Sequence, residues 1–510
     1  MLKYLESLSI LIKSITILDF IKKKYLKLEN LKNLVFLVEL SFKISNYLEK
    51  KKQIEIYEIM INVLVNYICC IRNLIPMQES VLKLIDTNCP RLMFEIMKQN
   101  VSTKEVIANS LRILAKLSIS STFSDYLMEY PELIKTLLEI LEVYKENNFF
   151  SMRLAFILAN LTTYDESASS LIYFELKGFK IIFDTFAYYI SKTTNEDDYF
   201  ETMLKSFSNF DFLEQGDKDV LNKIIRLLAN IFTEESSSLD FISNNYSNYK
   251  LLLRKLRFFM NENEVSNNSE LLICVLSCIS NILYWDKPSL VQKDFELETL
   301  KQDLVSAVSF IILQPKNEEI LIEGLRVISN LSRTKQGVGQ IVNIKFYDAI
   351  NILINHRSRD VVYYSIGILI NISQDQTFKK SPVCIEIFYG LIDLLDECCI
   401  DDVDILNCAM KALTNIISDN LKNDNDTMVK YFKRLDELLS RFGKECDIIL
   451  SSDEIEAEEV EEISQLRNII NAVVNSIPDE EFDCPYTLCK RKFKSKDHLD
   501  DHITRRHLKG

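Results

Sequence analysis

The stretch LAFILANLTTY, residues 154–164, decides the fold of this chain because near-copies of it recur along most of the sequence. Each copy has pairs of apolar residues, then an asparagine, an apolar residue and a short polar stretch. We call the asparagine position the marker. The clearest further copies are IIRLLANIFTE at 224–234, VLSCISNILYW at 275–285, LRVISNLSR at 325–333, SIGILINISQD at 365–375 and MKALTNIISD at 410–419. Weaker copies centre on Asn73 and on Lys116, where lysine replaces asparagine.

The spacing of the markers predicts a repeat protein. Consecutive markers are 43, 44, 70, 51, 49, 41 and 44 residues apart. That period is typical of a helical solenoid of armadillo or HEAT type, in which neighbouring units of two or three helices bury one another's apolar faces. The long spacing between Asn160 and Asn230 contains an acidic, aromatic stretch, so we expect an insertion loop at about 195–219. With only 9 Gly and 8 Pro in 510 residues, the chain should be almost all-α.

The repeated pattern resembles that of armadillo-repeat proteins over roughly residues 50–445. The second half most resembles the armadillo repeat-containing protein 2 family, on EGLRVISNLSR from Glu323, VVYYSIGILINISQD from Val361 and LNCAMKALTNIISD from Leu406. This resemblance implies an all-α, armadillo-like superhelical solenoid. It also implies an adaptor that carries radial-spoke or central-pair components into cilia and flagella.

The expected organisation has four parts. N-terminal capping helices occupy 1–50, and armadillo-like repeats occupy 51–445. An acidic linker and an amphipathic closing helix follow at 446–480, where SSDEIEAEEVEE from Ser451 carries seven acids in twelve residues. A zinc finger occupies 481–510.

The resemblance places the markers on the third helix of each repeat, facing a concave groove. Residues four and seven positions earlier share that helix face. Nuclear-import receptors of this fold carry Trp four residues before the marker, whereas the single Trp of this chain, Trp285, follows its marker, so a receptor for basic nuclear signals is not expected. The expected groove residues are the markers Asn160, Asn230, Asn281, Asn330, Asn371 and Asn415, and a cationic stripe of Arg112, Arg153, Lys223, Arg226, Arg326 and Lys411. The stripe suits an extended acidic partner segment whose backbone the asparagines would bind; the alternative is ordinary solvated charge on helix faces.

The last 30 residues contain a metal-ligand pattern. Cys484 and Cys489 are followed by His502 and His507, in the order and spacing of a ββα finger that holds one structural Zn²⁺. Eight basic and three acidic side chains fall between Cys484 and Gly510, while the whole chain has a net charge of −14. One finger reads only about 3 bp, so we expect it to dock protein or to be structural, with weak nucleic-acid contact as the alternative.

The sequence contains few motifs that indicate other classes of function. There is no P-loop, no GxGxxG motif after a strand, no HExxH and no nucleophile elbow, so an enzyme is not expected. Neither a signal peptide nor a stretch of 18 uncharged apolar residues is present, so no membrane association is expected. The scattered cysteines should be reduced thiols packed as small apolar residues in a cytosolic or nuclear protein.

These observations lead to one main prediction and one alternative. The main prediction is a non-enzymatic scaffold or adaptor in the cytoplasm or in a cilium or flagellum, with a protein partner in the groove and a second contact at the finger. Linking two modules raises the effective concentration of each for its partner. The alternative is a nuclear regulator associated with nucleic acid, in which the finger targets and the solenoid recruits.

Overall fold

The computed structural model describes residues 2–18, 28–75, 78–192, 214–260, 268–287, 294–315, 317–398, 402–420, 426–451, 457–476, 482–483 and 492–493. Helices with short connections make up nearly all of this part of the chain, which confirms the expected all-α, armadillo-like solenoid. The chain divides into two compact units, an N-terminal unit of residues 1–294 and a C-terminal unit of residues 295–510.

The N-terminal unit is helical throughout its described residues. Its elements are α1 (Leu2–Ile15), α3 (Leu28–Lys50), α4 (Ile54–Leu74), α5 (Gln78–Ile85), α6 (Cys89–Gln99), α7 (Lys104–Leu117), α8 (Ser121–Glu129), α9 (Pro131–Tyr144), α10 (Asn148–Tyr164), α11 (Ser167–Ser170), the π-helical turn η1 (Leu171–Glu175), α12 (Phe179–Ser191), α13 (Gln215–Ile231), α14 (Glu235–Asn244), α15 (Tyr246–Phe258) and α17 (Ser269–Trp285).

The C-terminal unit continues the same helical pattern and adds one short hairpin. Its elements are α18 (Phe295–Leu313), α19 (Glu318–Leu331), α20 (Lys335–Asn343), α21 (Tyr347–Leu353), α22 (Arg359–Ile372), α23 (Gln376–Lys379), α24 (Pro382–Glu397), α25 (Val403–Asn420), α26 (Asp426–Leu450), α27 (Ala457–Ser476), β1 (Phe482–Asp483) and β2 (Lys492–Phe493).

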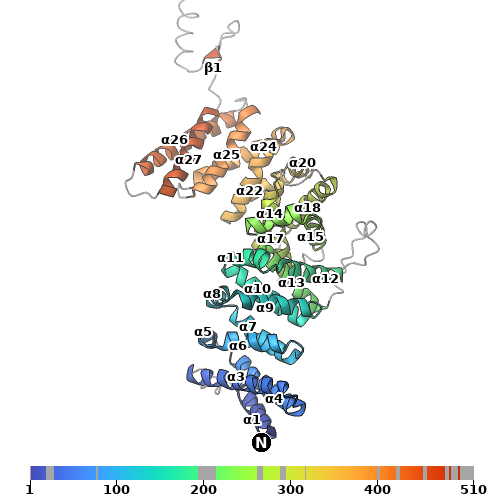
Figure 1. Cartoon of the computed structure of the whole chain (residues 1–510). Coiled ribbons are helices and arrows are strands. Elements are labelled where there is room, and N and C mark those ends of the chain that lie inside the picture. Colours follow the sequence, from blue (N-terminus) through green and yellow to red (C-terminus); the bar gives the residue numbers. More distant parts are fainter. Residues whose placement is uncertain are drawn as a thin grey trace, which may run out of the picture. The chain divides into compact units, whose positions relative to one another are not determined.

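The helices that carry the markers stack on one another within each unit, and we call them the marker helices. In the N-terminal unit α4, α7, α10, α13 and α17 contact one another in that order (Figure 1). In the C-terminal unit α19 contacts α22, and α22 contacts α25. Stacking places the same face of each repeat side by side, because every repeat carries its marker at the same helical position.

Local sequence explains where several helices begin. The side-chain oxygens of Asn147, Asn268 and Asn317 accept backbone N–H bonds in the first turns of the marker helices α10, α17 and α19. Such caps satisfy donors that have no partner inside the helix. Pro131 and Pro382 open α9 and α24, where a missing N–H costs nothing.

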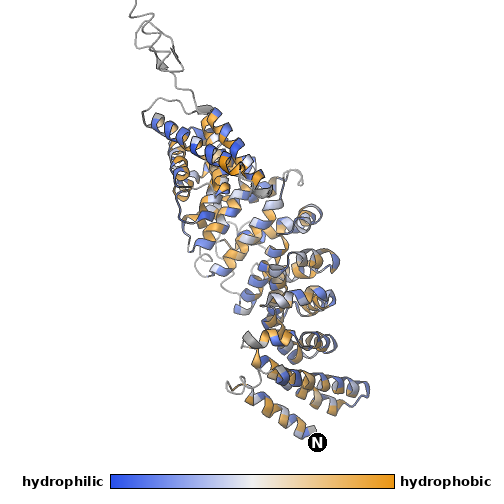
Figure 2. Ribbon diagram, turned by 90° about the vertical axis from the view of Figure 1, so that its left-hand side faces the viewer, coloured by the Kyte–Doolittle hydropathy of each residue, from blue (hydrophilic) through white to orange (hydrophobic). Residues whose placement is uncertain are grey.

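The core is built from the apolar side of each helix. Figure 2 shows helices with one hydrophobic and one hydrophilic side, as expected for amphipathic helices in a stacked array. The helix α4 has the length and hydropathy of a membrane span, but 61% of its apolar window is buried inside the fold, as in the core helix of a soluble domain. Cys70, Cys89 and Cys278 are free thiols with no exposed surface.

Two expected boundaries change. Residues 215–219, assigned to the insertion, form the first turn of α13, where Asp217 is buried. The Asp217 carboxylate accepts hydrogen bonds from Lys192 Nζ at 2.9 Å and Asn148 Nδ2 at 3.3 Å, and these bonds hold the start of α13 against α12 and α10. The remainder of the insertion, 195–213, lies outside the described residues.

The acidic linker is shorter than expected. Residues 446–450 complete α26, and α27 begins at Ala457, inside the acidic stretch. The predicted closing helix exists as α27, which packs against α25 and α26 through Ile463, Leu466 and Val473.

The hairpin β1–β2 is all that is described of the expected finger. Its strands pair antiparallel, Phe482 with Phe493 and Asp483 with Lys492. The four expected zinc ligands, Cys484, Cys489, His502 and His507, lie outside the described residues, so the finger and its metal stay predictions. Among the described residues no cluster of three or more His, Cys, Asp or Glu side chains could hold a metal ion.

Candidate protein-binding surface

The marker asparagines lie between repeats and bind the preceding marker helix. Asn230 Nδ2 donates to Ala159 O at 3.0 Å, and Asn281 Nδ2 donates to Ala229 O at 2.9 Å. In both cases the acceptor stands one residue before the preceding marker. Asn415 repeats this bond with Ile370 O at 3.2 Å in the C-terminal unit.

A second acceptor stands two residues after the preceding marker. Asn160 Nδ2 donates to Ser118 Oγ at 3.0 Å, and Asn371 Nδ2 donates to Ser332 Oγ at 2.8 Å. The marker amides therefore join successive repeats. Sequence reasoning assigned these asparagines only to a partner's backbone, whereas at least one N–H of each amide in these pairs is used inside the fold.

The same bond reveals the role of α1. Asn73 Nδ2 donates to Thr16 Oγ1 at 3.1 Å and to Lys13 O at 3.4 Å. These acceptors stand two residues after and one residue before Ser14, so Ser14 takes the place of a marker on α1. The helix α1 packs on α4 in the way a marker helix packs on the next, and it covers the face of α4 that a preceding repeat would cover.

Two predicted cations of the N-terminal unit gather around one aromatic ring. The guanidinium carbon of Arg153 lies 3.6 Å from the centroid of the Phe149 ring, and that of Arg112, on α7, lies 5.0 Å from it. Arg153 also donates from Nη1 to Phe149 O at 2.8 Å. Burial, and then the neighbouring Arg112 charge, lower the pKa of Arg153. Within the described residues neither arginine forms an ion pair, so two positive charges stay uncompensated on adjacent helices.

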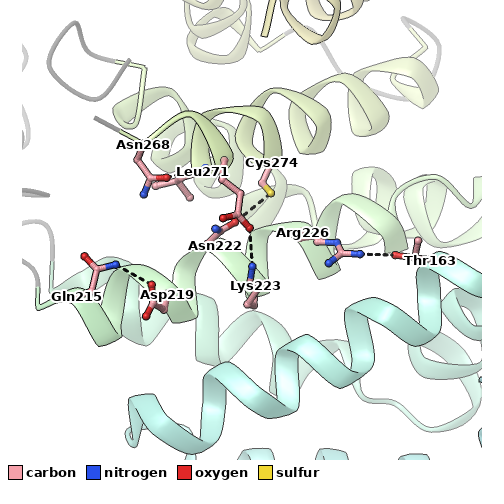
Figure 3. Close-up of polar contacts among 10 residues, drawn as sticks. Thr163, Gln215, Asp219, Asn222, Lys223, Arg226, Asn268, Leu271 and Cys274 are labelled. Carbon is pink, nitrogen blue, oxygen red and sulfur yellow. Dashed lines mark hydrogen bonds and ion pairs between the residues drawn. The ribbon is translucent and has the colours of Figure 1, made fainter. Parts of the chain in front are cut away.

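The next marker helix continues this face. Figure 3 shows Arg226 of α13 bound to Thr163 of α10, with a distance of 3.2 Å between Nη2 and Oγ1. Lys223, one turn earlier, lies 6.0 Å from the Phe156 ring centroid and forms an ion pair of 2.7 Å with Glu270 of α17. The hydrogen bond from Lys223 lowers the pKa of Glu270. The charge of Lys223 is therefore matched, whereas Arg226 donates its hydrogen bond to a neutral hydroxyl and interacts with Glu270 only through its charge.

The predicted cations of the C-terminal unit meet a different environment. Arg326 Nη1 binds both carboxylate oxygens of Glu323, at 2.8 and 2.9 Å. On the next marker helix Arg359 binds Asp402 and Asp404, whose hydrogen bonds raise its pKa. Lys411 is exposed on α25. Of the two cations predicted for the groove of this unit, Arg326 is therefore paired with an acid of its own helix.

Two residues of the N-terminal face, Phe149 and Lys116, were not predicted from the sequence as site residues. Phe149 lies four residues before Arg153, a spacing that puts the two on one helix face and could have identified it. From the sequence we predicted Lys116 only as a weaker marker. It is exposed one turn after Arg112, so this face of α7 carries two cations. Its replacement of asparagine was the available signal.

The described residues offer few candidate catalytic groups. Desolvation raises the pKa of the Cys70 and Cys89 thiols to about 12, so neither is an activated nucleophile at neutral pH. His356, the only His of this part of the chain, accepts the backbone N–H of Ser358 in a connection between helices. The arrangement presents Arg and Phe side chains on neighbouring helices of the array.

Comparison with known proteins agrees with this fold. No protein-family model matches the chain. Curated relatives include armadillo repeat-containing protein 2 from Mus musculus, 24% identical over 369 residues, and from Bos taurus, 23% identical over 385 residues. The aligned regions cover 72% and 71% of this chain and 40% of each relative.

Solved structures show the same architecture. An engineered protein superposes with a TM-score of 0.55, at 16% identity, over 89% of this chain and 98% of its own. A structure from work on a phosphorylation switch that controls the interaction between cadherin and beta-catenin superposes with a TM-score of 0.56, at 13% identity, over 87% of this chain and 82% of its own. The chain therefore has the fold of an armadillo-like solenoid. It is similar to armadillo repeat-containing protein 2, and it spans less than half the length of those relatives.

Proposed function

We propose that this chain is a non-enzymatic scaffold or adaptor that binds partner proteins on the face formed by its marker helices. The observation that carries the proposal is the cluster of Arg112 and Arg153 around Phe149, which spans two repeats and has no carboxylate partner among the described residues. Arginine and aromatic side chains dominate the energetics of protein interfaces. The interaction between cadherin and beta-catenin, studied in the structural neighbour, supports a protein-binding role for this fold.

The partner we propose is a protein with an extended acidic segment. The chain as a whole is acidic, with a net charge of −14, so a basic face is an exception that favours one kind of partner. The predicted finger, with zinc held by Cys484, Cys489, His502 and His507, would supply a second contact. No residue of the described part is assigned to the membrane or to nucleic acid in this proposal.

The cellular role we propose is assembly of the axoneme. Similarity to armadillo repeat-containing protein 2 supports an adaptor for radial-spoke or central-pair components, working in the cytoplasm and in the cilium or flagellum. The alternative role, a nuclear regulator, depends on the basic residues of the predicted finger. Salt-sensitive binding of DNA or RNA by the full chain, lost on replacing those residues, would favour the alternative.

A charge reversal tests the binding face. The variant Arg153→Glu with Arg226→Glu changes the marker helices α10 and α13, and the control Lys98→Glu with Lys135→Glu changes exposed residues of α6 and α9, which carry no marker. Tagged full-length proteins are expressed in a flagellated cell and their cross-linked partners are identified. Partners that include axonemal proteins, retained by the control and lost by the variant, are the expected result. Equal capture by both variants would overturn the assigned face, and absence of any cross-linked partner of the unaltered protein would overturn the scaffold.

A further inference from the structure

Some cations of the predicted stripe are paired with acidic side chains and others are not, and this difference points to one binding position. We propose, on the basis of the proposed function, that a partner's acidic segment is anchored in the N-terminal unit alone, at a patch of Arg112, Phe149, Arg153, Phe156 and Arg226. We call this the anchor patch. The segment it takes is an extended polypeptide with acidic side chains about three residues apart.

The charges of the anchor patch are available to a ligand. Arg112, Arg153 and Arg226 form no ion pair within the described residues, although Arg153 and Arg226 each donate one hydrogen bond to a neutral oxygen. The charge of Arg226 also helps to lower the pKa of Glu270, so Arg112 and Arg153 are the less compensated members of the patch. A guanidinium has five N–H donors, so most donors of each side chain are left for an external carboxylate. The stacking of Arg153 on Phe149 at 3.6 Å holds its plane in place, which reduces the entropy lost when a carboxylate binds.

The aromatic rings supply apolar contact between the charges. Phe149 and Phe156 lie on α10, are partly exposed, and are flanked by the cations of α7 on one side and those of α13 on the other. Such a surface suits a segment in which apolar side chains alternate with acids, since the rings can cover the apolar ones while the guanidinium groups bind the carboxylates.

The repeat geometry gives the register of that segment. Packed helices lie about 8–10 Å apart, and an extended chain advances roughly 3.3 Å per residue. Residues three apart therefore meet successive marker helices. Because Arg112, Arg153 and Arg226 lie on α7, α10 and α13, a Glu-x-x-Glu-x-x-Glu spacing matches the anchor patch.

Neighbouring charges limit the anchor patch to these helices. On α13 itself the cation Lys223 is already paired with Glu270 of α17. In the C-terminal unit Arg326 is paired with Glu323, and Arg359 with Asp402 and Asp404. A carboxylate approaching there would have to displace an existing partner and meet its negative charge, which disfavours binding.

Peptide binding to the full-length protein tests the inference. The probe is a fluorescein-labelled 12-residue peptide with Glu at every third position and Leu and Ser between. The control peptide has the same composition, with all Glu at one end. Fluorescence anisotropy at moderate salt gives the dissociation constants. We expect Arg112→Gln and Arg153→Gln each to weaken binding of the spaced peptide by about tenfold, and the clustered peptide to bind at least about fivefold more weakly.

Control variants separate the anchor patch from general basicity. Lys411→Gln removes a cation at the position equivalent to Arg112 in another repeat, and Arg326→Gln removes a paired one; both should leave affinity within about twofold. Arg153→Lys keeps the charge but loses the planar fork, so it should bind with intermediate affinity. Far-UV circular dichroism checks that each variant is folded.

The possible failures are distinguishable. No binding of the spaced peptide, equal binding of both peptides, or equal loss in Lys411→Gln and Arg153→Gln would overturn the anchor patch. Cross-linked partners found for the unaltered protein would still uphold the scaffold in that case, whereas their absence would overturn the scaffold whatever the peptide does.

Discussion

Asn230 of α13 donates from its side-chain amide to the backbone carbonyl of Ala159, the residue next to the preceding marker, at 3.0 Å. Its amide also reaches Thr162 Oγ1 at 3.0 Å and Thr163 Oγ1 at 2.9 Å. The residue that defines the repeat in the sequence is thus the residue that joins one repeat to the next. A pattern in the chain corresponds directly to a contact in the fold.

Removing this junction should destabilise the N-terminal unit. We expect Asn230→Ala to lower the free energy of unfolding by about 0.5–1.5 kcal/mol, because the hydrogen bonds between the two repeats are lost while the Ala159 carbonyl keeps the Thr162 and Thr163 hydroxyls as donors. Urea unfolding followed by circular dichroism measures the effect. The control is Asn343→Ala, an exposed residue at the end of α20, which should change stability by less than about 0.5 kcal/mol. Equal effects for both would contradict the junction.

Two glycines in one helix make a matched pair. A Cβ added to Gly337 would lie 2.0 Å from Leu331 O, whereas one added to Gly339 would meet nothing within 4 Å. Gly337→Ala should therefore cost about 1–3 kcal/mol, since backbone must move. Gly339→Ala should gain about 0.5–1 kcal/mol from helix propensity. Thermal unfolding of both variants checks the difference, and a stable Gly337→Ala protein would refute the close approach.

Buried thiols should make the protein sensitive to alkali. Burial raises the pKa of Cys89 from 9.0 to about 12. Below pH 9 the folded and unfolded states both keep the proton and the stabilisation is complete. Above pH 9 the unfolded thiol ionises while the folded one does not, so stability falls by up to about 1.4 kcal/mol per pH unit for each such thiol until pH 12.

The measurement compares Cys89→Ala with the unaltered protein. Urea unfolding between pH 8 and 10.5 in the presence of a reductant should give a shallower decline for the variant, even though its stability at pH 8 is lower because a cavity forms. Parallel declines in the two proteins would show that Cys89 is accessible to solvent.

The predicted finger should bind one zinc ion per chain. Metal analysis of the purified full-length protein should give about one equivalent, and Cys484→Ser or His507→Ala should abolish it. The helices should melt as before in these variants, because the four ligands follow α27, the last described helix, in the sequence. Replacing His498, which is too early in the spacing to be a ligand, serves as the control. Zinc retained by Cys484→Ser would disprove the ligand set.

Much of the fold could be read from local pattern. The markers Asn160, Asn281 and Asn330 each lie on a helix whose start and apolar face follow from nearby residues, and the expected all-α, armadillo-like solenoid is confirmed. The start of α13 was placed too late because an acidic stretch such as Gln215–Asp219 is ordinarily solvated. Here Lys192 and Asn148, distant in sequence, bind Asp217 and order that turn.

The candidate site, too, could be predicted from the sequence only in part. Helical periodicity indicated that each of four arginines shares a face of its own helix with the marker, because helical geometry repeats over a few residues. These are Arg112, Arg153, Arg226 and Arg326. Only the folded arrangement shows that Lys223 is neutralised by Glu270 of α17 while Arg112 of α7 lies against Phe149 of α10 without a carboxylate. Whether a charge is compensated depends on distances of a few ångströms between side chains of packed helices, and side-chain order along the chain does not specify those distances.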